Sequence, residues 1–139
     1  MYLLAWCLLW LLPPAPQTVN LTIATSVEKP GNLYVAVYDN EQAFAEREAV
    51  VSLVRPTNGQ PISLEVRLPA AGDYVLAAYH DLNGNGELDN NLFGAPAEPY
   101  GFSKVPPSKW REPRFDEIAT TVNPESGMIS IDLKKWKEY

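Results

Sequence analysis

Apolar and polar residues alternate along much of the chain, as they do in half-buried β-strands. Val19–Val27, Ile62–Leu68 and Met128–Leu133 carry apolar side chains at every second position over most of their length. Successive side chains of a strand point to opposite faces of a sheet. One face of each segment is therefore expected to contact a hydrophobic core, and the other face to contact water.

Four more segments have the composition of strands. Leu33–Tyr38 and Asp73–His80 are nearly continuous apolar runs, and Val50–Val54 and Ile118–Val122 are shorter. Turn-forming residues separate these segments: Pro30-Gly31-Asn32, Pro56-Thr57-Asn58-Gly59, Pro69-Ala70-Ala71-Gly72 and Asn123-Pro124-Glu125-Ser126-Gly127. Short strands with turn residues at the junctions predict an all-β fold, an antiparallel immunoglobulin-like or transthyretin-like sandwich of about seven strands.

The remaining segments add little regular structure to this sandwich. Glu41–Glu48 has helical composition over about two turns. Proline is concentrated in Ala95–Pro113, which predicts an extended loop and no second domain. We expect this loop to be ordered, because its aromatic side chains would otherwise expose a large apolar surface. Residues 16–139 are therefore expected to form a single β-sandwich domain.

The chain begins with a short apolar segment, Met1–Leu12, which is followed by Pro13-Pro14-Ala15. This segment is too short to span a bilayer comfortably and has the length of a signal-peptide core. We interpret residues 1–15 as a signal peptide, with the position of cleavage left open, and we expect Cys7 to be removed with it. The mature chain would then have no integral membrane span and would be periplasmic or extracellular. The alternative is a buried N-terminal strand or helix.

The charge and the cysteine and histidine counts exclude several kinds of binding partner and of catalytic or metal site. The net charge of −6 argues against binding to nucleic acid or to an anionic membrane surface. The chain has one cysteine and one histidine. These counts exclude an internal disulfide framework and a Cys/His zinc site. After removal of Cys7 they also exclude a Cys–His nucleophile pair.

The sequence from Asp81 to Asp89 has the spacing of a calcium-binding loop. Oxygen-bearing side chains recur at alternate positions, Gly86 allows a sharp turn, and a backbone carbonyl group follows it. The candidate calcium ligands are Asp81, Asn83, Asn85, the carbonyl group of Glu87, and Asp89. Calcium takes about six to eight oxygen ligands, and this set with two carboxylates predicts a site of modest affinity.

The loop also departs from a complete calcium-binding pattern. Leu92 stands where an EF-hand loop has a bidentate glutamate, and a strand leads into the loop where an EF-hand has a helix. Asn-Gly steps form turns without metal, so an Asx-rich turn is the alternative interpretation.

The sequence offers few catalytic side chains. His80 and Asp81 are adjacent on a strand and therefore point to opposite faces, so we expect His80 to be a hydrogen-bonded histidine at a strand end. The sequence places no base beside Ser103. A carboxylate pair such as Glu98 and Asp116 leaves open a hydrolase that acts on extracellular polysaccharide or peptide.

Four aromatic residues are concentrated in and beside the proline-rich loop: Phe93, Tyr100, Phe102 and Trp110. Aromatic side chains give a large contact area at a low entropic cost, so they are suited to binding a sugar or a peptide. The alternative is that they pack down and hold the loop against the sandwich.

A longer motif resembles a known family. Its residues are Gly72-Asp73-Tyr74, His80-Asp81-x-Asn83-x-Asn85-Gly86-x-Leu88-Asp89 and Gly94-x-Pro96-x-Glu98-x-Tyr100-Gly101-Phe102-Ser103. They resemble the bacterial family catalogued as domain of unknown function 2141, and a looser similarity extends from about Val19 to Leu133. The resemblance implies exported bacterial proteins with an immunoglobulin-like or transthyretin-like sandwich and no established activity. The family often has glutamate after the His-Asp pair, where this chain has Leu82.

Two classes of function remain open from these residues. We expect a non-catalytic exported module, with a structural calcium loop, that binds a protein or carbohydrate partner outside the cytoplasm. The alternative is the extracellular hydrolase. Exposed aromatic side chains in a flat row would favour binding, whereas a cleft with converging carboxylates would favour catalysis.

Overall fold

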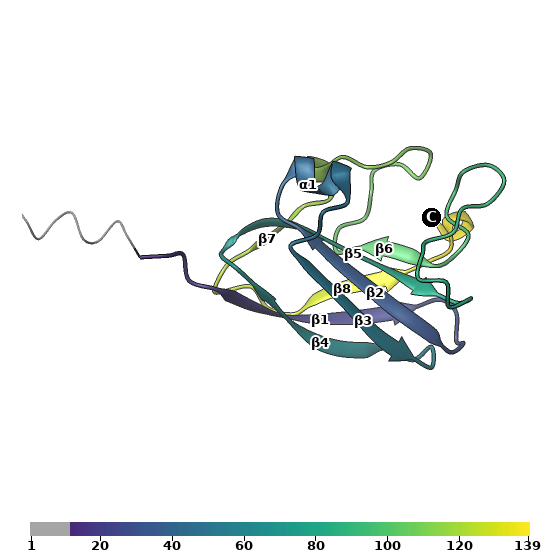
Figure 1. Cartoon of the computed structure of the whole chain (residues 1–139), viewed down its shortest axis with the longest axis horizontal. Coiled ribbons are helices and arrows are strands. Elements are labelled where there is room, and N and C mark those ends of the chain that lie inside the picture. The colour runs from purple at the N-terminus through teal and green to yellow at the C-terminus, as the bar shows by residue number, and fades with distance from the viewer. Residues whose placement is uncertain (1–11) are drawn as a thin grey trace, which may run out of the picture.

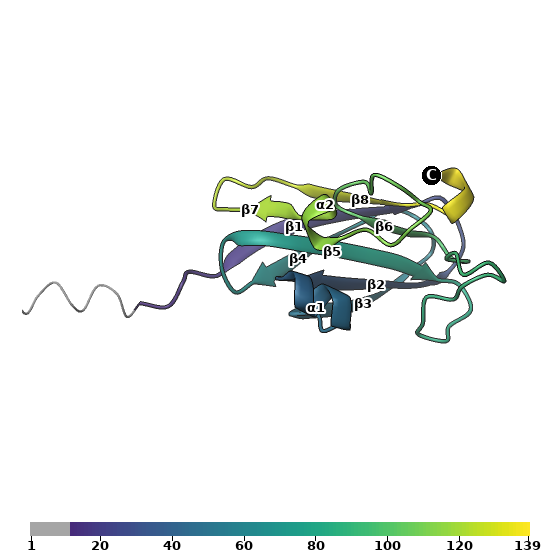
Figure 2. The ribbon, with the colours of Figure 1, turned by 90° about the horizontal axis from the view of Figure 1, so that it is seen from above.

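The computed structural model describes residues 12–139, and these residues form a two-layered β-sandwich (Figure 1, Figure 2). One sheet has the strand order β4-β1-β8, and the other has the order β3-β2-β5-β6, with β7 paired to β5. The strands are β1 (Gln17–Thr25), β2 (Gly31–Tyr38), β3 (Val51–Thr57), β4 (Ile62–Leu68), β5 (Gly72–Asp81), β6 (Tyr100–Phe102), β7 (Thr120–Val122) and β8 (Ile129–Leu133). The helices are α1 (Glu41–Glu46), α2 (Phe115–Ile118) and the short 3-10 helix η2 (Trp136–Glu138).

The predicted all-β sandwich is confirmed, with two differences in detail. The described residues form eight strands. Tyr100–Phe102 forms β6 inside the segment that we expected to be extended loop, because its main chain pairs with residues 77–79 of β5. The sandwich is also not wholly antiparallel, since β8 runs parallel to β1 with Ile129 opposite Leu21. A parallel pair needs a long connection, and β1 and β8 are the first and last strands.

The core lies between the two sheets and follows the alternation of the sequence. On β1, Val19, Leu21 and Ile23 are buried, and on the pairing strand β4 the inward residues include Val66 and Leu68. The facing sheet contributes the inward residues of β2 and β5: Leu33, Val35, Val37, Tyr74, Leu76 and Ala78. The residues between these buried positions point outward, and their character differs between the two sheets.

The helices α1 and α2 cover one end of the outer face of sheet β3-β2-β5-β6. Phe44 of α1 and Ile118 of α2 are buried there against Tyr38 and Val75. Figure 1 shows α1 near the end of β2 and the β5–β6 loop at the opposite end of β5.

The predicted signal peptide falls mostly outside the described residues, because residues 1–11, which include Cys7, are not described. Residues 12–16 have no regular secondary structure. Within residues 12–139, no helix has the length and apolar character needed to cross a bilayer.

Candidate functional site

Asp81 closes the loop that follows β5. Its side chain is buried, and Oδ1 and Oδ2 accept hydrogen bonds from the main-chain N–H groups of Gly84 and Gly86, each at 2.8 Å. The two glycines have φ angles of 76° and 77°, which side chains with a Cβ rarely adopt. The Asn-Gly steps of the sequence thus fold as a tight turn around this carboxylate.

Asp89 closes the other side of the same loop. Asn83 Nδ2 donates to its Oδ2 at 2.6 Å, and Asn85 Nδ2 donates to both carboxylate oxygens at 2.9 Å. The amide oxygens of the two asparagines accept hydrogen bonds from the N–H groups of Asn85 and Glu87. The side-chain amides therefore satisfy the Asp89 carboxylate with hydrogen bonds from within the loop.

Glu98 ties this loop to the segment that leads into β6. It is 5% exposed, and its Oε1 accepts a hydrogen bond from the Leu82 N–H at 2.9 Å. Its Oε2 accepts a longer one, 3.4 Å, from the Asp89 N–H. Sequence patterns suggest Glu98 only as half of a catalytic pair and do not indicate this role. The available signal was its place in the family-like motif, two residues before Tyr100.

The predicted calcium ligands are close together, but they are arranged as an Asx-rich turn. Asn83 and Asn85 donate side-chain hydrogen bonds to Asp89, Asp81 accepts from two main-chain N–H groups of the same loop, and Glu87 is exposed beside them. Their oxygen atoms suit calcium chemically. The two asparagines, however, direct their NH₂ groups at Asp89, so an ion would require these amides to turn. Among residues 12–139, no three His, Cys, Asp or Glu side chains are grouped to hold a metal ion. Calcium binding stays a prediction.

His80 lies at the end of β5 on the inward side and is buried. Its Nδ1 lies 3.1 Å from the Thr25 hydroxyl oxygen, as expected for a hydrogen-bonded histidine, whereas its buried Nε2 has no hydrogen-bond partner among the described residues. Gly31 packs so closely that a Cβ there would lie 2.7 Å from Nε2. Burial lowers the pKa of His80, and the charge of Asp81 offsets part of this effect. The imidazole is thus built into the core at a place where a positive charge is unfavourable.

The residues considered for hydrolysis do not converge. Glu98 is engaged in the β5–β6 loop, and Asp116 is an exposed residue of α2 that pairs with Arg114 at 3.2 Å. The Ser103 hydroxyl lies 2.6 Å from the Thr120 hydroxyl. None of these three candidate side chains lines the hollows described below.

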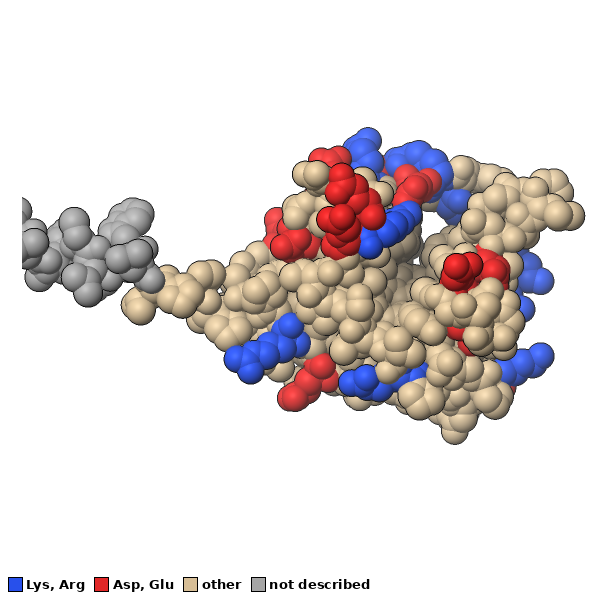
Figure 3. Space-filling model, in the orientation of Figure 1, with Lys and Arg blue, Asp and Glu red and all other residues tan. Residues whose placement is uncertain are grey.

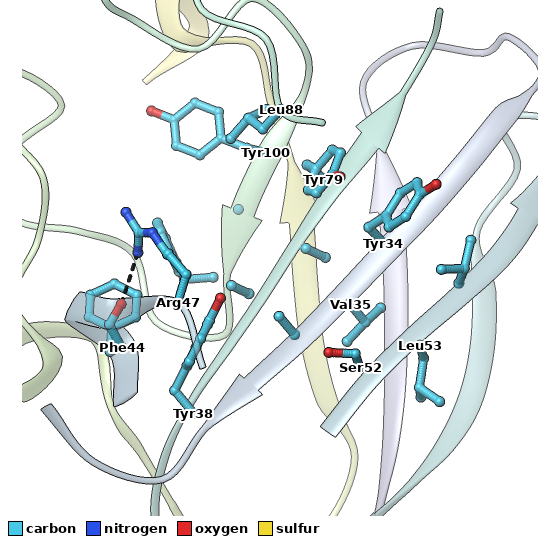
Figure 4. Close-up of a pocket in the computed structure, with 16 residues that line it drawn as sticks. Tyr34, Val35, Tyr38, Phe44, Arg47, Ser52, Leu53, Tyr79, Leu88 and Tyr100 are labelled. Carbon is cyan, nitrogen blue, oxygen red and sulfur yellow. Dashed lines mark hydrogen bonds between the residues drawn. The ribbon is translucent and has the colours of Figure 1, made fainter. Parts of the chain in front are cut away.

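An apolar groove of about 320 Å³ runs over the outer face of sheet β3-β2-β5-β6 (Figure 4). Its floor includes the small side chains Ala36 of β2 and Ala77 of β5. Aromatic side chains from three strands and α1 stand around this floor: Tyr34, Tyr38, Phe44, Tyr79, Tyr100 and Phe102. Aromatic walls over an alanine floor form a concave surface of the kind that binds small molecules.

Tyr34 and Tyr79 form one wall of the groove. Their rings stack at a centroid distance of 5.0 Å and an angle of 5°. The Tyr79 hydroxyl donates a hydrogen bond to the Gly86 carbonyl at 2.8 Å. Burial, with added repulsion from Tyr34, Asp81 and Glu98, raises the pKa of Tyr79 to about 12, so this hydroxyl keeps its proton. The Asx-rich loop is thereby fixed to the border of the groove.

Arg47 forms the opposite wall, where α1 ends. Asn40 begins α1, because its Oδ1 accepts a hydrogen bond from the Ala43 N–H at 2.8 Å. Arg47 ends it with a φ of 59°, and within residues 12–139 it is the one non-glycine residue with positive φ. Its guanidinium lies 5.1 Å from the centre of the Phe44 ring, and Nη1 donates to the Phe44 carbonyl at 3.2 Å. In Figure 4 the Tyr38 hydroxyl points toward this arginine.

A second hollow of about 740 Å³ continues the groove toward the proline-rich loop. The two hollows share Phe44, Arg47, Leu88, Tyr100 and Phe102. Figure 3 shows this face hollowed between the acidic side chains over α1 and the protruding loop at the right. Trp110 and Trp136 line the far end, with their rings edge to face at 5.0 Å.

The four aromatic residues predicted as a binding surface all border this continuous groove. Tyr100 and Phe102 lie on β6 and are partly buried, so they also hold the segment against the sheet. Phe93 and Trp110 remain 95% and 77% exposed. Sequence reasoning missed Tyr34, Tyr38, Tyr79 and Arg47. Tyr34 and Tyr38 occupy alternate positions of Leu33–Tyr38 and therefore point to the same face of the strand. This signal was hidden because the whole segment is apolar or aromatic.

The family comparison agrees with the motif in the Asx-rich loop and β6. Residues 21–130 match the model of a family described as uncharacterized proteins conserved in bacteria, domain of unknown function 2141. The chain belongs to this family. The matched residues include parts of both sheets, the Asx-rich loop and the residues that line the first hollow. No curated protein and no solved structure matches the chain.

Proposed function

We propose that the chain is a non-catalytic binding module that works outside the cytoplasm and takes its ligand in the groove on sheet β3-β2-β5-β6. The observation that carries this proposal is the hollow of about 320 Å³ with aromatic walls and an alanine floor. Ligand sites are commonly concave, mostly apolar and about 300–1,000 Å³ in volume. Export rests on the apolar segment Met1–Leu12, as in the sequence analysis.

The side chains that line the groove favour binding over hydrolysis. Cleavage of polysaccharides generally uses two carboxylates that flank the scissile bond. Within the described part of the chain, Glu112 is the one carboxylate that lines either hollow, and it pairs with Arg47. The groove instead offers ring faces and tyrosine hydroxyls, which supply contact area and orienting hydrogen bonds.

Calcium belongs to this proposal as a structural ion in the Asx-rich loop. The support is the alternate placement of oxygen-bearing residues from Asp81 to Asp89, together with the Tyr79–Gly86 hydrogen bond that links this loop to the groove. An ion between Asp81 and Asp89 would exchange hydrogen bonds within the loop for coordination. It would thereby stiffen the border of the groove, where Leu88 is located.

Fluorescence of the neutral dye N-phenylnaphthylamine tests the binding function. The dye brightens in apolar surroundings, so we expect saturable binding to the folded chain. Ala77→Phe would fill the floor of the groove and should abolish binding. Glu65→Phe, which adds the same ring to the exposed face of β4, should bind the dye as the wild type does. Absence of binding, or equal binding by Ala77→Phe, would contradict the proposal.

A further inference from the structure

Arg47 occupies a position where glycine is usually favoured. It follows α1 in the left-handed conformation, with φ 59° and ψ 33°. A side chain is less stable than glycine there, because its Cβ crowds the main chain. A non-glycine residue held in such a conformation is often found at a functional site. The unfavourable conformation of Arg47 therefore suggests that its side chain has a function in the groove.

The guanidinium of Arg47 lies where the two hollows meet. It lines both of them, beside the Phe44 ring and the Tyr38 hydroxyl (Figure 4). Burial raises the pKa of Tyr38 and the charge of Arg47 works against that rise, which agrees with this proximity. The first hollow, whose other lining residues are uncharged, thus contains a positive charge with planar N–H donors.

The partner of Arg47 is an exposed carboxylate on another segment. Nη2 of Arg47 donates to Oε1 of Glu112 in the proline-rich loop, and the two side chains are 55% and 63% exposed. Exposed ion pairs of this kind contribute little to stability. An incoming carboxylate can therefore replace Glu112 without a large loss of stability.

The other two cations of the groove are held by less replaceable partners. Arg111 donates to both carboxylate oxygens of Glu117, at 2.6 and 2.8 Å, and the Glu117 side chain is 15% exposed. Lys109 Nζ donates to the main-chain oxygen of Tyr139 at 2.7 Å and lies 4.8 Å from the centre of the Trp136 ring. Arg47 is thus the cation best placed to receive an anion from a ligand.

We propose that the groove binds a small amphipathic carboxylate, such as a medium-chain fatty acid. Its apolar body would lie on Ala36 and Ala77 between the aromatic side chains, and its carboxylate would pair with Arg47 in place of Glu112. This inference rests on the proposed binding function and specifies its ligand class. Charge complementarity supports it, because a guanidinium pairs with a carboxylate through two parallel hydrogen bonds.

Displacement of N-phenylnaphthylamine by decanoate and by decanol tests the ligand class. The two competitors share their alkyl chain and differ in the head group. Decanoate should bind the wild type about two- to fivefold more tightly, as expected for a partly exposed ion pair. Arg47→Gly should remove this preference, which is measured as the ratio of the two affinities in the same variant, so that any loss of wall contact affects both competitors alike. Glu112→Gln should tighten decanoate binding, because the internal competitor is gone. Arg67→Gly removes an exposed arginine from β4 and should keep the wild-type preference.

Thermal melting of Arg47→Gly checks that the fold is kept, since glycine suits the left-handed conformation. Arg47→Asn, which also tolerates that conformation, serves as a second variant and should lose the preference as well. Equal binding of decanoate and decanol to the wild type would overturn the inference, and so would an unchanged preference in both Arg47 variants. In either case dye binding that Ala77→Phe abolishes would still support the binding function, so the two proposals can fail separately.

Discussion

The two sheets share one core but present different outer faces. The outward residues of β1, β4 and β8 are mostly polar and include Asn20, Thr22, Ser63, Glu65, Arg67, Ser130 and Asp132. The outward residues of β2, β5 and β6 are mostly aromatic or small and include Tyr34, Ala36, Tyr38, Ala77, Tyr79, Tyr100 and Phe102. We call these the polar face and the aromatic face.

The polar face has the composition expected of a solvent-exposed side of a sandwich. An antiparallel sheet with one solvated side alternates apolar and polar residues, and β1 and β4 do so. The aromatic face differs from this expectation, because outward tyrosines do not help the sheet to bury its inner side. These outward side chains are mostly half-buried around an apolar groove, and concave apolar surfaces of this kind are typical of ligand sites. The difference between the faces therefore supports the aromatic face as the proposed binding surface.

The largest expected effect concerns the core that both sheets share. Leu21 of β1 and Leu76 of β5 are fully buried. Leu21→Ala and Leu76→Ala should each lower the free energy of unfolding by about 2–5 kcal/mol in urea denaturation, because each leaves a cavity. Asn20→Ala on the polar face should change it by less than about 0.5 kcal/mol. A cost for Leu21→Ala as small as that for Asn20→Ala would contradict the assigned orientation of β1.

Calcium should act on the border of the aromatic face alone. At about 100 times its Kd, calcium would add about 2.7 kcal/mol to the free energy of unfolding, which corresponds to several degrees in Tm. Melting curves with calcium and with a chelator measure this shift. Asp89→Ala should abolish it, whereas Asp73→Ala, at the other end of β5, should keep it. No shift in the wild type would leave the loop as an Asx-rich turn without an ion. A shift that survives in Asp89→Ala would place the ion elsewhere.

Tyr79 should contribute a smaller amount of stability from the aromatic face. Tyr79→Ala removes the stack on Tyr34 and the hydrogen bond to the Gly86 carbonyl. We expect a loss of about 1–2 kcal/mol in the free energy of unfolding. Tyr79→Phe keeps the ring and should lose about 1 kcal/mol or less. If the two variants were equally unstable, the stack would contribute nothing and the wall of the groove would depend on the hydroxyl alone.

His80 should give the smallest effect, a gradual loss of stability in mild acid. Its pKa in the folded chain lies below the ordinary value of 6.5, because burial disfavours the charged form. The unfolded chain therefore binds this proton more readily. The free energy of unfolding should fall as the pH drops below 6.5 and level off below the folded-state pKa.

Urea denaturation of the wild type and of His80→Gln, from neutral pH down to about pH 5, measures this slope. The variant should be flat over that range, because the chain has one histidine. Glu117 and Glu138 have lowered pKa values and act at more acidic pH. An equal slope in the variant would show that His80 is not its source.

The inward half of the fold could be predicted from the sequence, because alternation is a local property. The alternation alone predicts that Val19, Leu21 and Ile23 share the buried face of a strand, whatever that strand pairs with, and the three are buried. β6 could not be predicted in the same way. Three residues in a proline-rich segment carry no periodicity of their own, and they become a strand only through pairing with β5.

The candidate site was predictable only in part, for a related reason. Phe93, Tyr100, Phe102 and Trp110 are close in sequence and could be named together. Their partners Tyr34 and Tyr79 come from β2 and β5, which are distant in sequence and meet through the register of the sheet. The position of Arg47 could not be predicted, because it ends α1 in the left-handed conformation, where glycine is the usual residue. Patterns along the chain predict neither the pairing of distant strands nor an unfavourable main-chain conformation.

Amide chemical shifts recorded during a titration with decanoate test the central claim, that the aromatic face is the binding surface, most directly. The perturbed amides should lie on β2, β5 and β6 and around Arg47, while those of β1, β4 and β8 should stay unchanged. Perturbations centred on the polar face, or none on the aromatic face at saturating decanoate, would contradict this claim.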